Sequence, residues 1–218
     1  MFSRSGVVQT PDLENMKEGH LVPLQSNTTT RPQDSAALAG LPLRDYQHEA
    51  VEAVFAAQAA GTRRQLLLLP TGTGKTVVFD AVIERVLHQT GGRALVLAHR
   101  DELLSQAQAK LRAVAPRLRS GIVRAERDEH DAQVVIASVQ TLIRPARLAR
   151  LGTDFDVVVI DEAHHAAADS YTFILRQLGA FDDDGPLLLG VTATADRGDG
   201  QGLDGVFESI VYLSLIHI

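Results

Sequence analysis

Short apolar runs recur along the chain from about residue 41 onward, and longer segments with a helical spacing of apolar positions separate them. The runs are Gln65–Leu69, Ala94–Ala98, Val134–Ser138, Val157–Asp161 and Leu187–Val191. Each run is apolar nearly throughout instead of alternating with polar residues, which is typical of strands covered on both faces of a parallel sheet. The pattern therefore predicts a set of buried, parallel strands.

The segments between these runs predict helices. One predicted helix runs from Lys75 to about Gln89, with valines at positions 78, 82 and 86 on one face. A second follows Asp101, which we expect to cap it, and a third follows Asp169. Strands that alternate with helices form right-handed βαβ units, so we predict an α/β fold with a mainly parallel sheet flanked by helices on both faces. Ligands of such sheets bind beyond the carboxyl ends of the strands.

Both ends of the chain depart from this pattern. Residues 1–40 include the polar stretch Gln25–Ser35, which buries too little apolar surface to offset its ordering entropy, so a mostly disordered tail is predicted. A native start at Met16 is an alternative. Leu213–Ile218 reads LSLIHI, the translation of a transposase adapter used in sequencing libraries, and we interpret it as an artefact that ends a truncated fragment. The alternative is a genuine final strand, because the segment is apolar.

Composition and charge exclude several classes of protein. Apolar residues make up 45% of the 218 residues and charged residues 22%, as in soluble globular proteins. The absence of cysteine excludes disulfides, cysteine-ligated zinc and a cysteine nucleophile. No apolar run approaches the roughly 20 residues that cross a bilayer, and no signal peptide is evident, so we expect a cytoplasmic protein without membrane contact. The net charge of −6 means that any nucleic-acid binding must rest on local groups.

The segment Pro70–Thr76, PTGTGKT, follows the first predicted strand and opens the first predicted helix. A phosphate-binding loop requires this strand–loop–helix context. Its glycines let backbone N–H groups face phosphate oxygens, and the helix N-terminus points at the same anion. Lys75 can reach the β- and γ-phosphates of ATP, and the Thr76 hydroxyl can bind Mg²⁺. Leu69 stands where the general form of the motif has glycine.

Two carboxylates, Asp161 and Glu162, end the fourth predicted strand. A strand that ends in these residues places both carboxylates at the sheet edge, beside the phosphate loop. Asp161 can hold the coordination shell of Mg²⁺, and Glu162 can orient and deprotonate an attacking water. A solvated acidic turn is the plain alternative, and the presence of the phosphate loop argues against it.

Two histidines, His164 and His165, follow the carboxylates and raise the question of a metal site. Adjacent histidines in a loop do not converge on one ion as histidines one helical turn apart do. We therefore favour a different interpretation, in which His164 links the ATP site to the loop after the fifth predicted strand. That loop carries Thr192 and Thr194.

Together these motifs resemble the first RecA-like motor domain of superfamily 2 helicases of the DEAD/DEAH-box type, over about Leu41 to Tyr212. PTGTGKT resembles motif I, DEAH at 161–164 resembles motif II, and TAT at 192–194 resembles motif III. The resemblance implies that Lys75 and Glu162 are catalytic. It also implies that the loop binds the nucleotide through Thr71, Gly72, Thr73, Gly74, Lys75 and Thr76.

Three further segments resemble motifs of the same family. LRDYQ at 43–47 resembles its adenine-reading motif, in which Gln47 would bond the base and Arg44 would assist; an amphipathic helix start is the alternative. AHRDELLSQ at 98–106 resembles motif Ia, and IASVQTL at 136–142 resembles motif Ib. The resemblance implies that these last two hold a nucleic-acid strand through Arg100, Ser138, Gln140 and Thr141. The arginines at 112, 117, 119, 124, 127, 144, 147 and 150 form either a solvated face or a further contact.

The resemblance is closest to the DNA-repair and restriction-motor branch, through the stretch at 192–212, although Ala195 stands where the family usually has proline. It implies an ATP-dependent DNA helicase or translocase, with DNA favoured over RNA, and a second RecA-like domain that we expect to be absent from this fragment. Two alternatives remain open: the motor of a restriction enzyme, and a nucleotide-dependent nucleic-acid-binding module without productive hydrolysis. Glu162 argues against the module, which needs no base.

Overall fold

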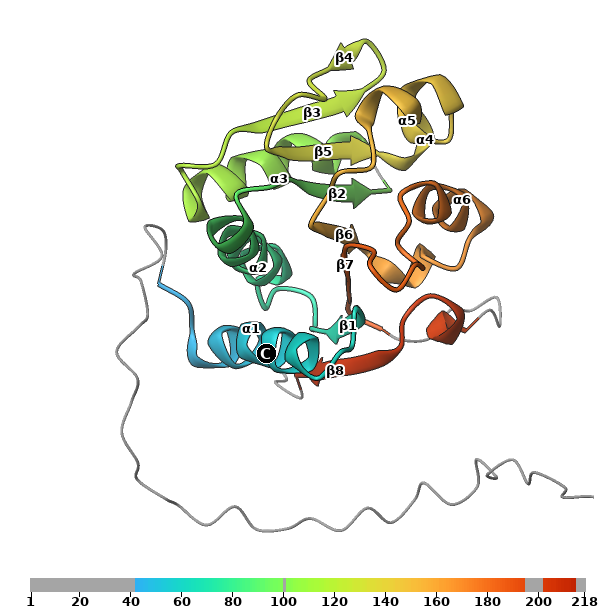
Figure 1. Cartoon of the computed structure of the whole chain (residues 1–218). Coiled ribbons are helices and arrows are strands. Elements are labelled where there is room, and N and C mark those ends of the chain that lie inside the picture. Colours follow the sequence, from blue (N-terminus) through green and yellow to red (C-terminus); the bar gives the residue numbers. More distant parts are fainter. Residues whose placement is uncertain (1–41, 100, 195–201, 215–218) are drawn as a thin grey trace, which may run out of the picture. The chain divides into compact units, whose positions relative to one another are not determined.

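A computed structural model describes residues 42–99, 101–194 and 202–214 of the chain, and these lie in one compact unit, Ala36–Ile218. The predicted N-terminal tail, Arg100, Ala195 and residues 215–218 lie outside the described residues. In the described part, one eight-stranded sheet carries helices on both faces (Figure 1). The predicted α/β fold is therefore confirmed.

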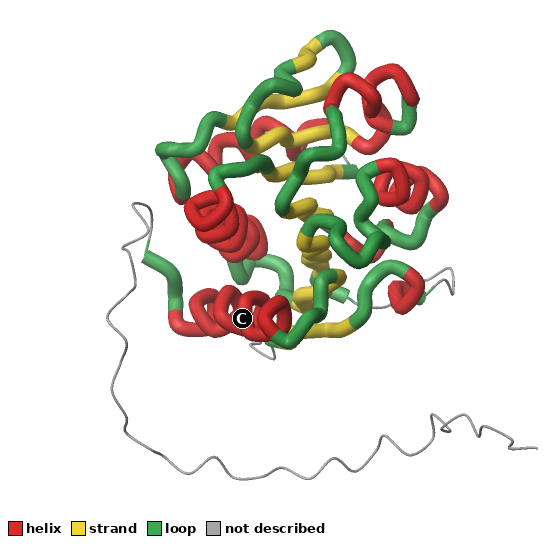
Figure 2. Tube along the Cα trace, viewed as in Figure 1, coloured by secondary structure: helices red, strands yellow, loops and turns green. Residues whose placement is uncertain are grey.

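Helices and strands alternate along most of the described chain (Figure 2). The strands are β1 (Arg64–Leu68), β2 (Ala94–Ala98), β3 (Ser120–Arg124), β4 (Arg127–Asp128), β5 (Val134–Ser138), β6 (Val157–Asp161), β7 (Leu187–Thr192) and β8 (Ser209–Leu213). The α-helices are α1 (Asp45–Ala59), α2 (Lys75–Thr90), α3 (Asp101–Val114), α4 (Val139–Leu142), α5 (Pro145–Leu151) and α6 (Asp169–Gln177). Two short 3₁₀ helices are η2 (Ala163–His165) and η3 (Leu203–Gly205). No helix in these ranges is long and apolar enough to span a membrane.

The strand order, β4-β3-β5-β2-β6-β7-β1-β8, brings distant motifs together. All neighbouring strands are parallel except β3 and β4. Leu68 at the end of β1 pairs with Thr192 of β7, and Asp161 at the end of β6 pairs with Val191. The carboxyl ends of β1, β6 and β7 therefore meet at one edge of the sheet.

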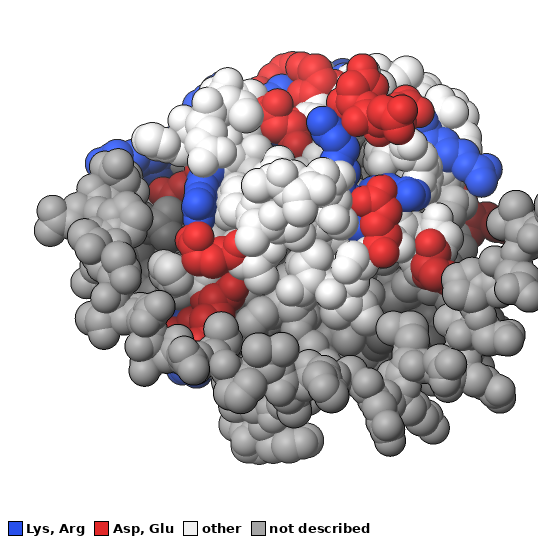
Figure 3. Space-filling view, turned by 60° about the horizontal axis from the view of Figure 1, so that its bottom comes forward, with Lys and Arg blue, Asp and Glu red and all other residues white. Residues whose placement is uncertain are grey.

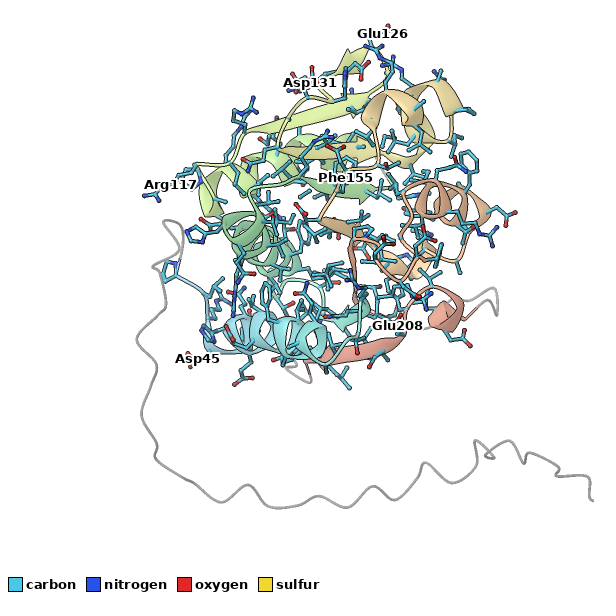
Figure 4. All side chains as sticks on the ribbon, viewed as in Figure 1. Asp45, Arg117, Glu126, Asp131, Phe155 and Glu208 are labelled. Atoms are coloured by element: carbon cyan, nitrogen blue, oxygen red, sulfur yellow. The ribbon has the colours of Figure 1, made fainter. Side chains whose placement is uncertain are left out.

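The five predicted strands are confirmed as β1, β2, β5, β6 and β7, with bounds that differ by one residue at β1 and β7. Leu69, which the pattern places in the first strand, still donates its N–H to the Thr192 carbonyl at 2.9 Å. The apolar pattern does not reveal β3, β4 or β8. β3 buries only its three central residues, and β8 is an edge strand with exposed or half-buried side chains. The side chains labelled Glu126 and Asp131 mark the β4 end of the sheet, and Glu208 marks the β8 end (Figure 4).

The side chains of alternate strand residues pack into two hydrophobic cores, one on each face of the sheet. Leu67 and Val96 belong to the core under α1, α2 and α3, whereas Leu66 and Leu97 belong to the core under α4, α5 and α6. Because both faces are covered, the central strands need apolar residues at every position. This is the reason why their sequences do not alternate.

Candidate active site

The phosphate loop connects β1 to α2, and one threonine holds it closed. Thr73 donates its N–H and its hydroxyl to the carbonyl of Pro70, at 3.3 and 2.7 Å, and its side chain is buried. Gly72 and Gly74 adopt φ angles of 84° and 80°, which glycine reaches without a Cβ penalty. α2 begins at the next residue, Lys75, so the loop amides and the positive end of the helix are placed to bind one anion.

Side chains at the start of α1 donate hydrogen bonds to the backbone of this loop. The Gln47 side-chain amide donates to the Thr73 carbonyl at 2.9 Å, and the Tyr46 hydroxyl donates to the same oxygen at 2.8 Å. The Gln47 amide oxygen accepts the backbone N–H of Arg44 at 3.0 Å. A Cβ at position 74 would lie 2.6 Å from the Gln47 amide nitrogen, so Gly74 is needed for this contact as well as for its φ angle.

These contacts give Gln47 a role that the sequence did not suggest. The side chain is buried, and both polar groups of its amide already have partners in the protein. The adenine contact of Gln47 and Arg44 stays a prediction. Tyr46 was missed, although it lies in the LRDYQ segment, because the resemblance assigns it no role; Arg44 donates to its hydroxyl at 3.3 Å.

Lys75 and Glu162 meet at the centre of the site, although 87 residues separate them in sequence. The Lys75 ammonium lies 3.0 Å from Glu162 Oε1, and the exposed fractions of the two side chains are 11% and 36%. Glu162 adopts a φ angle of 55°, a left-handed conformation that costs of order 1–3 kcal/mol for a residue with a Cβ. Its N–H donates to Asp161 Oδ1 at 3.0 Å. This strained turn after β6 directs a carboxylate toward the lysine.

Oxygen donors suited to Mg²⁺ lie beside this pair. Thr76 is in the first turn of α2, and Asp161 ends β6. Burial raises the pKa of Asp161, the charge of Glu162 raises it further, and Lys75 opposes both. Mg²⁺ keeps several waters and takes one or two protein oxygens together with substrate phosphates, so a hydroxyl and a carboxylate next to a phosphate loop fit Mg²⁺ with ATP.

The residues predicted to couple the site to the β7 loop are also brought together. His164 Nδ1 lies 3.2 Å from the Thr192 hydroxyl and 3.4 Å from Glu162 Oε2. The Thr192 hydroxyl donates to the Thr194 carbonyl at 3.0 Å. A continuous polar path therefore joins Glu162 to the loop after β7. Its function in coupling stays a prediction.

Three histidines line a pocket of about 260 Å³ on the other side of Glu162. Its lining consists of Ala98, His99, Leu103, Asp161, Glu162, His164 and His165. The His165 ring centroid lies 4.4 Å from that of His99 and 4.1 Å from that of His164. Among the described residues, no group of three histidine or acidic side chains is arranged to hold a metal ion. The sequence could not reveal that His99, which directly follows β2, stacks on His165, the residue after motif II.

The predicted nucleic-acid contacts fall at the same sheet edge, with one exception. Ser138 ends β5 and Gln140 and Thr141 lie in α4, whereas Arg100 lies outside the described residues. Of the three that the structure describes, only Gln140 has an exposed side chain. Ser138 and Thr141 are buried, and the Thr141 hydroxyl accepts the N–H of Ala125 at 3.3 Å. Their hydroxyls are therefore not presented to solvent, and contact with nucleic acid through them stays untested.

Charge on the described surface is mixed. On the face shown in Figure 3, acidic and basic side chains surround an uncharged area. At the β4 edge, Arg147 and Arg150 each lie 2.9 Å from Asp128, and Arg127 lies 2.9 Å from Glu129. These ion pairs favour a solvated face for these three arginines over a free nucleic-acid contact.

Residues 40–197 of the chain match the family model described as type III restriction enzyme, res subunit. The putative ATP-dependent helicase IRC3 of Saccharomyces cerevisiae is 38% identical over 180 residues, which are 78% of this chain and 26% of the yeast protein. The DNA 3′-5′ translocase XPB2 of Sulfurisphaera tokodaii is 30% identical over 161 residues, which are 74% of this chain and 33% of that protein.

A solved structure shares the fold. The helicase domain of Pyrococcus furiosus Hef superposes with a TM-score of 0.61 at 25% identity, covering 74% of this chain and 38% of that one. The chain spans about a quarter to a third of the length of the two relatives above. The matched family segment contains both the phosphate loop and the Asp161–Glu162 turn.

Proposed function

Because this chain belongs to the type III restriction enzyme res subunit family of superfamily 2 helicase-like motors, we propose that it binds and hydrolyses ATP as the first RecA-like domain of a DNA helicase or translocase. The observation that carries the proposal is the contact of 3.0 Å between Lys75 and Glu162 beside the phosphate loop. In this proposal Lys75 binds the phosphates and Glu162 activates water, and the contact brings these two groups together.

Each residue of the site has a distinct task in this proposal. The triphosphate takes the place of Glu162 at the Lys75 ammonium and is held by the loop amides. Thr76 and Asp161 hold Mg²⁺, which neutralises charge on the transferred phosphoryl group when it is bound. Glu162, released from Lys75, orients the attacking water and accepts its proton.

We propose that the motor moves along DNA and that it is of the DNA-repair type. XPB2, a relative at 30% identity, is described as a DNA translocase, and the matching family is named for a restriction enzyme. The family description also supports a second candidate, the motor of a restriction enzyme. A nuclease or methylation module in the same protein would distinguish the second candidate from the first. We keep the cytoplasm as the proposed location.

We further propose that rapid turnover requires a second RecA-like domain against this site. Glu162 is 36% exposed, so the face on which water must be activated remains open in this domain. Arginines from an opposing domain stabilise the transferring phosphoryl in related hydrolases by 10³-fold or more. We therefore expect the 218-residue chain to bind Mg·ATP weakly, to hydrolyse it feebly and not to unwind nucleic acid.

Titration calorimetry of the 218-residue chain with Mg·ATP tests the assignment of the loop. We expect Lys75→Ala to remove most of the binding, because it deletes the charge that faces the phosphates. The matched control is Arg85→Ala, which removes a positive charge from the outer face of the same helix, where Arg85 pairs with Glu52 at 2.6 Å. Equal ATP affinity in wild type and Lys75→Ala would show that the loop does not bind the nucleotide.

A further inference from the structure

A buried carboxylate on α2 has an oxygen without a partner. Asp80 is 1% exposed, and its Oδ2 has no hydrogen-bond partner among the described residues. Burial raises the pKa of the Asp80 carboxyl to about 8, against the opposing charge of Lys110 and with a further upward contribution from Asp161. Buried polar atoms are nearly always paired, because leaving one unpaired costs free energy. The motifs of the sequence give Asp80 no role.

Asp80 lies on the same helix as Thr76, one of the two residues predicted to bind Mg²⁺. Thr76 and Asp80 are one helical turn apart on α2, so they lie on the same face of that helix. The Lys110 ammonium of α3 lies 3.5 Å from the Thr76 hydroxyl on this side. α2 also packs against β6, which ends in Asp161. Asp80 therefore lies on the face of α2 that carries Thr76, one turn farther from the loop, and this helix packs against the strand that ends in Asp161.

A second acidic residue on α2, Glu84, lies farther from the phosphate loop and allows a comparison with Asp80. Glu84 lies one turn beyond Asp80, and its Oε2 also has no partner among the described residues. Burial raises the pKa of Glu84 too, but the charges that act on it are Arg117 and His88, toward the far end of the helix. Glu84 is only half-buried, but it shares with Asp80 an acidic side chain with one oxygen that has no described partner, and it lacks the link to the magnesium donors. It therefore serves as a control on the same helix.

We infer that Asp80 is a positioning residue for Mg²⁺, whose carboxyl oxygen accepts a hydrogen bond from a water in the coordination shell of the ion held by Thr76 and Asp161. This inference rests on the proposed function. Outer-shell partners of this kind orient the ligands of a metal and typically change its affinity by 10- to 100-fold. Octahedral Mg²⁺ retains several waters, so such a partner has a water to hold.

The test measures the Mg²⁺ dependence of nucleotide binding in the 218-residue chain. Binding of a fluorescent ATP analogue is titrated at a series of free Mg²⁺ concentrations and in EDTA, for wild type, Asp80→Asn, Asp80→Ala and Glu84→Gln. For both Asp80 variants we expect affinity in EDTA within about 2-fold of wild type. We expect the half-effect Mg²⁺ concentration to rise roughly 10-fold or more in Asp80→Ala and by less in Asp80→Asn, whose amide oxygen can still accept a hydrogen bond. We expect Glu84→Gln to match wild type in both measurements.

The melting temperature without nucleotide provides a second readout. Replacing a buried, unpaired acid by an amide of the same shape is expected to leave the fold intact and to raise its melting temperature. A residue with a purely structural role would lower it and leave the Mg²⁺ half-effect unchanged. An unchanged half-effect in both Asp80 variants would overturn the inference alone. Absence of nucleotide binding by wild type would overturn the proposed function and the inference with it.

Discussion

At the scale of single residues, the proposed function gives Glu162 two opposing effects on ATP. Without nucleotide its carboxylate neutralises the Lys75 ammonium at 3.0 Å, so the phosphates must displace it before they can bind. Once displaced, it is the base in the proposed reaction. The left-handed turn that positions Glu162 directs its carboxylate toward the loop, where it can serve in either role.

Glu162→Gln separates these effects. The amide keeps the shape but neither competes as an anion for Lys75 nor accepts a proton. We expect ATP affinity to rise by up to about 5-fold, because a partly exposed ion pair contributes roughly 0.2–1 kcal/mol. We expect turnover to fall by about 10²–10⁴-fold when measured in a protein that also carries a second RecA-like domain.

The matched control is Glu52→Gln, which removes a carboxylate from the exposed pair with Arg85 and should change neither quantity. Binding is measured by calorimetry and turnover by phosphate release. A Glu162→Gln enzyme that hydrolyses ATP at the wild-type rate would show that another group activates the water. Weaker ATP binding in the variant would show that Glu162 does not compete with the phosphates.

At the scale of elements, α1 and the phosphate loop act as one unit. Two side chains of α1, Tyr46 and Gln47, donate to the same carbonyl of Thr73. The family resemblance instead assigns Gln47 to the adenine base. If Gln47 holds the loop, its loss should weaken binding of a ligand that has phosphates but no base. If Gln47 binds adenine, its loss should leave that ligand unaffected.

We expect Gln47→Ala to weaken both ATP and inorganic tripolyphosphate by about 2- to 10-fold, because a hydrogen bond of this kind contributes roughly 0.5–1.5 kcal/mol. Competition against a fluorescent ATP analogue measures both ligands. Tyr46→Phe, which removes one donor to the same oxygen, should produce a smaller loss in the same direction. A loss confined to ATP would mean that Gln47 reads adenine and does not hold the loop.

The elements also show what the sequence could and could not predict. Val157–Asp161 and its partner strands are apolar at every position because both faces are covered, and this signal is local. The phosphate loop is equally local, since glycines, lysine and threonine are adjacent in the chain. The apolar pattern does not predict β3 and β8, because an outer strand needs only a few buried residues.

Contacts that involve residues outside the motifs could not be predicted. The stacking of His99 on His165 and the position of Lys110 beside Thr76 depend on which strands and helices become neighbours. The burial of Ser138 and Thr141 likewise depends on tertiary packing. Motif spacing predicts which residues are candidates for binding a ligand, but it does not reveal the residues that hold these candidates in place.

At the scale of the whole molecule, the site is assembled at one edge of the sheet from strands far apart in sequence. β1, β6 and β7 are neighbours in the sheet, and each ends in a motif. The net charge of the chain is −6, so electrostatic attraction does not by itself bring DNA to this edge. We expect DNA affinity of the chain alone to be weak and strongly dependent on salt.

The last residues of the described chain belong to β8, the edge strand next to β1. β8 pairs with β1, and Leu213 lies opposite Leu68. The Ser214 N–H donates to the Leu68 carbonyl at 3.0 Å, whereas the Leu213 side chain is 56% exposed. The pairing of Leu213 and Ser214 with β1 is therefore mostly a matter of backbone hydrogen bonds.

If Leu213–Ile218 is adapter translation, its removal should change the free energy of unfolding little. We expect a chain ending at Tyr212 to lose about 1 kcal/mol, because it lacks the Ser214 hydrogen bond, and a chain ending at Ser214 to match the full chain. Denaturant melts of the three chains measure this, with ATP affinity as the control for an intact site. A loss of several kcal/mol in both shortened chains would contradict the interpretation. Buried strand side chains contribute roughly 1.5–3 kcal/mol each, so a loss of that size would mean that the final residues form a native part of the sheet.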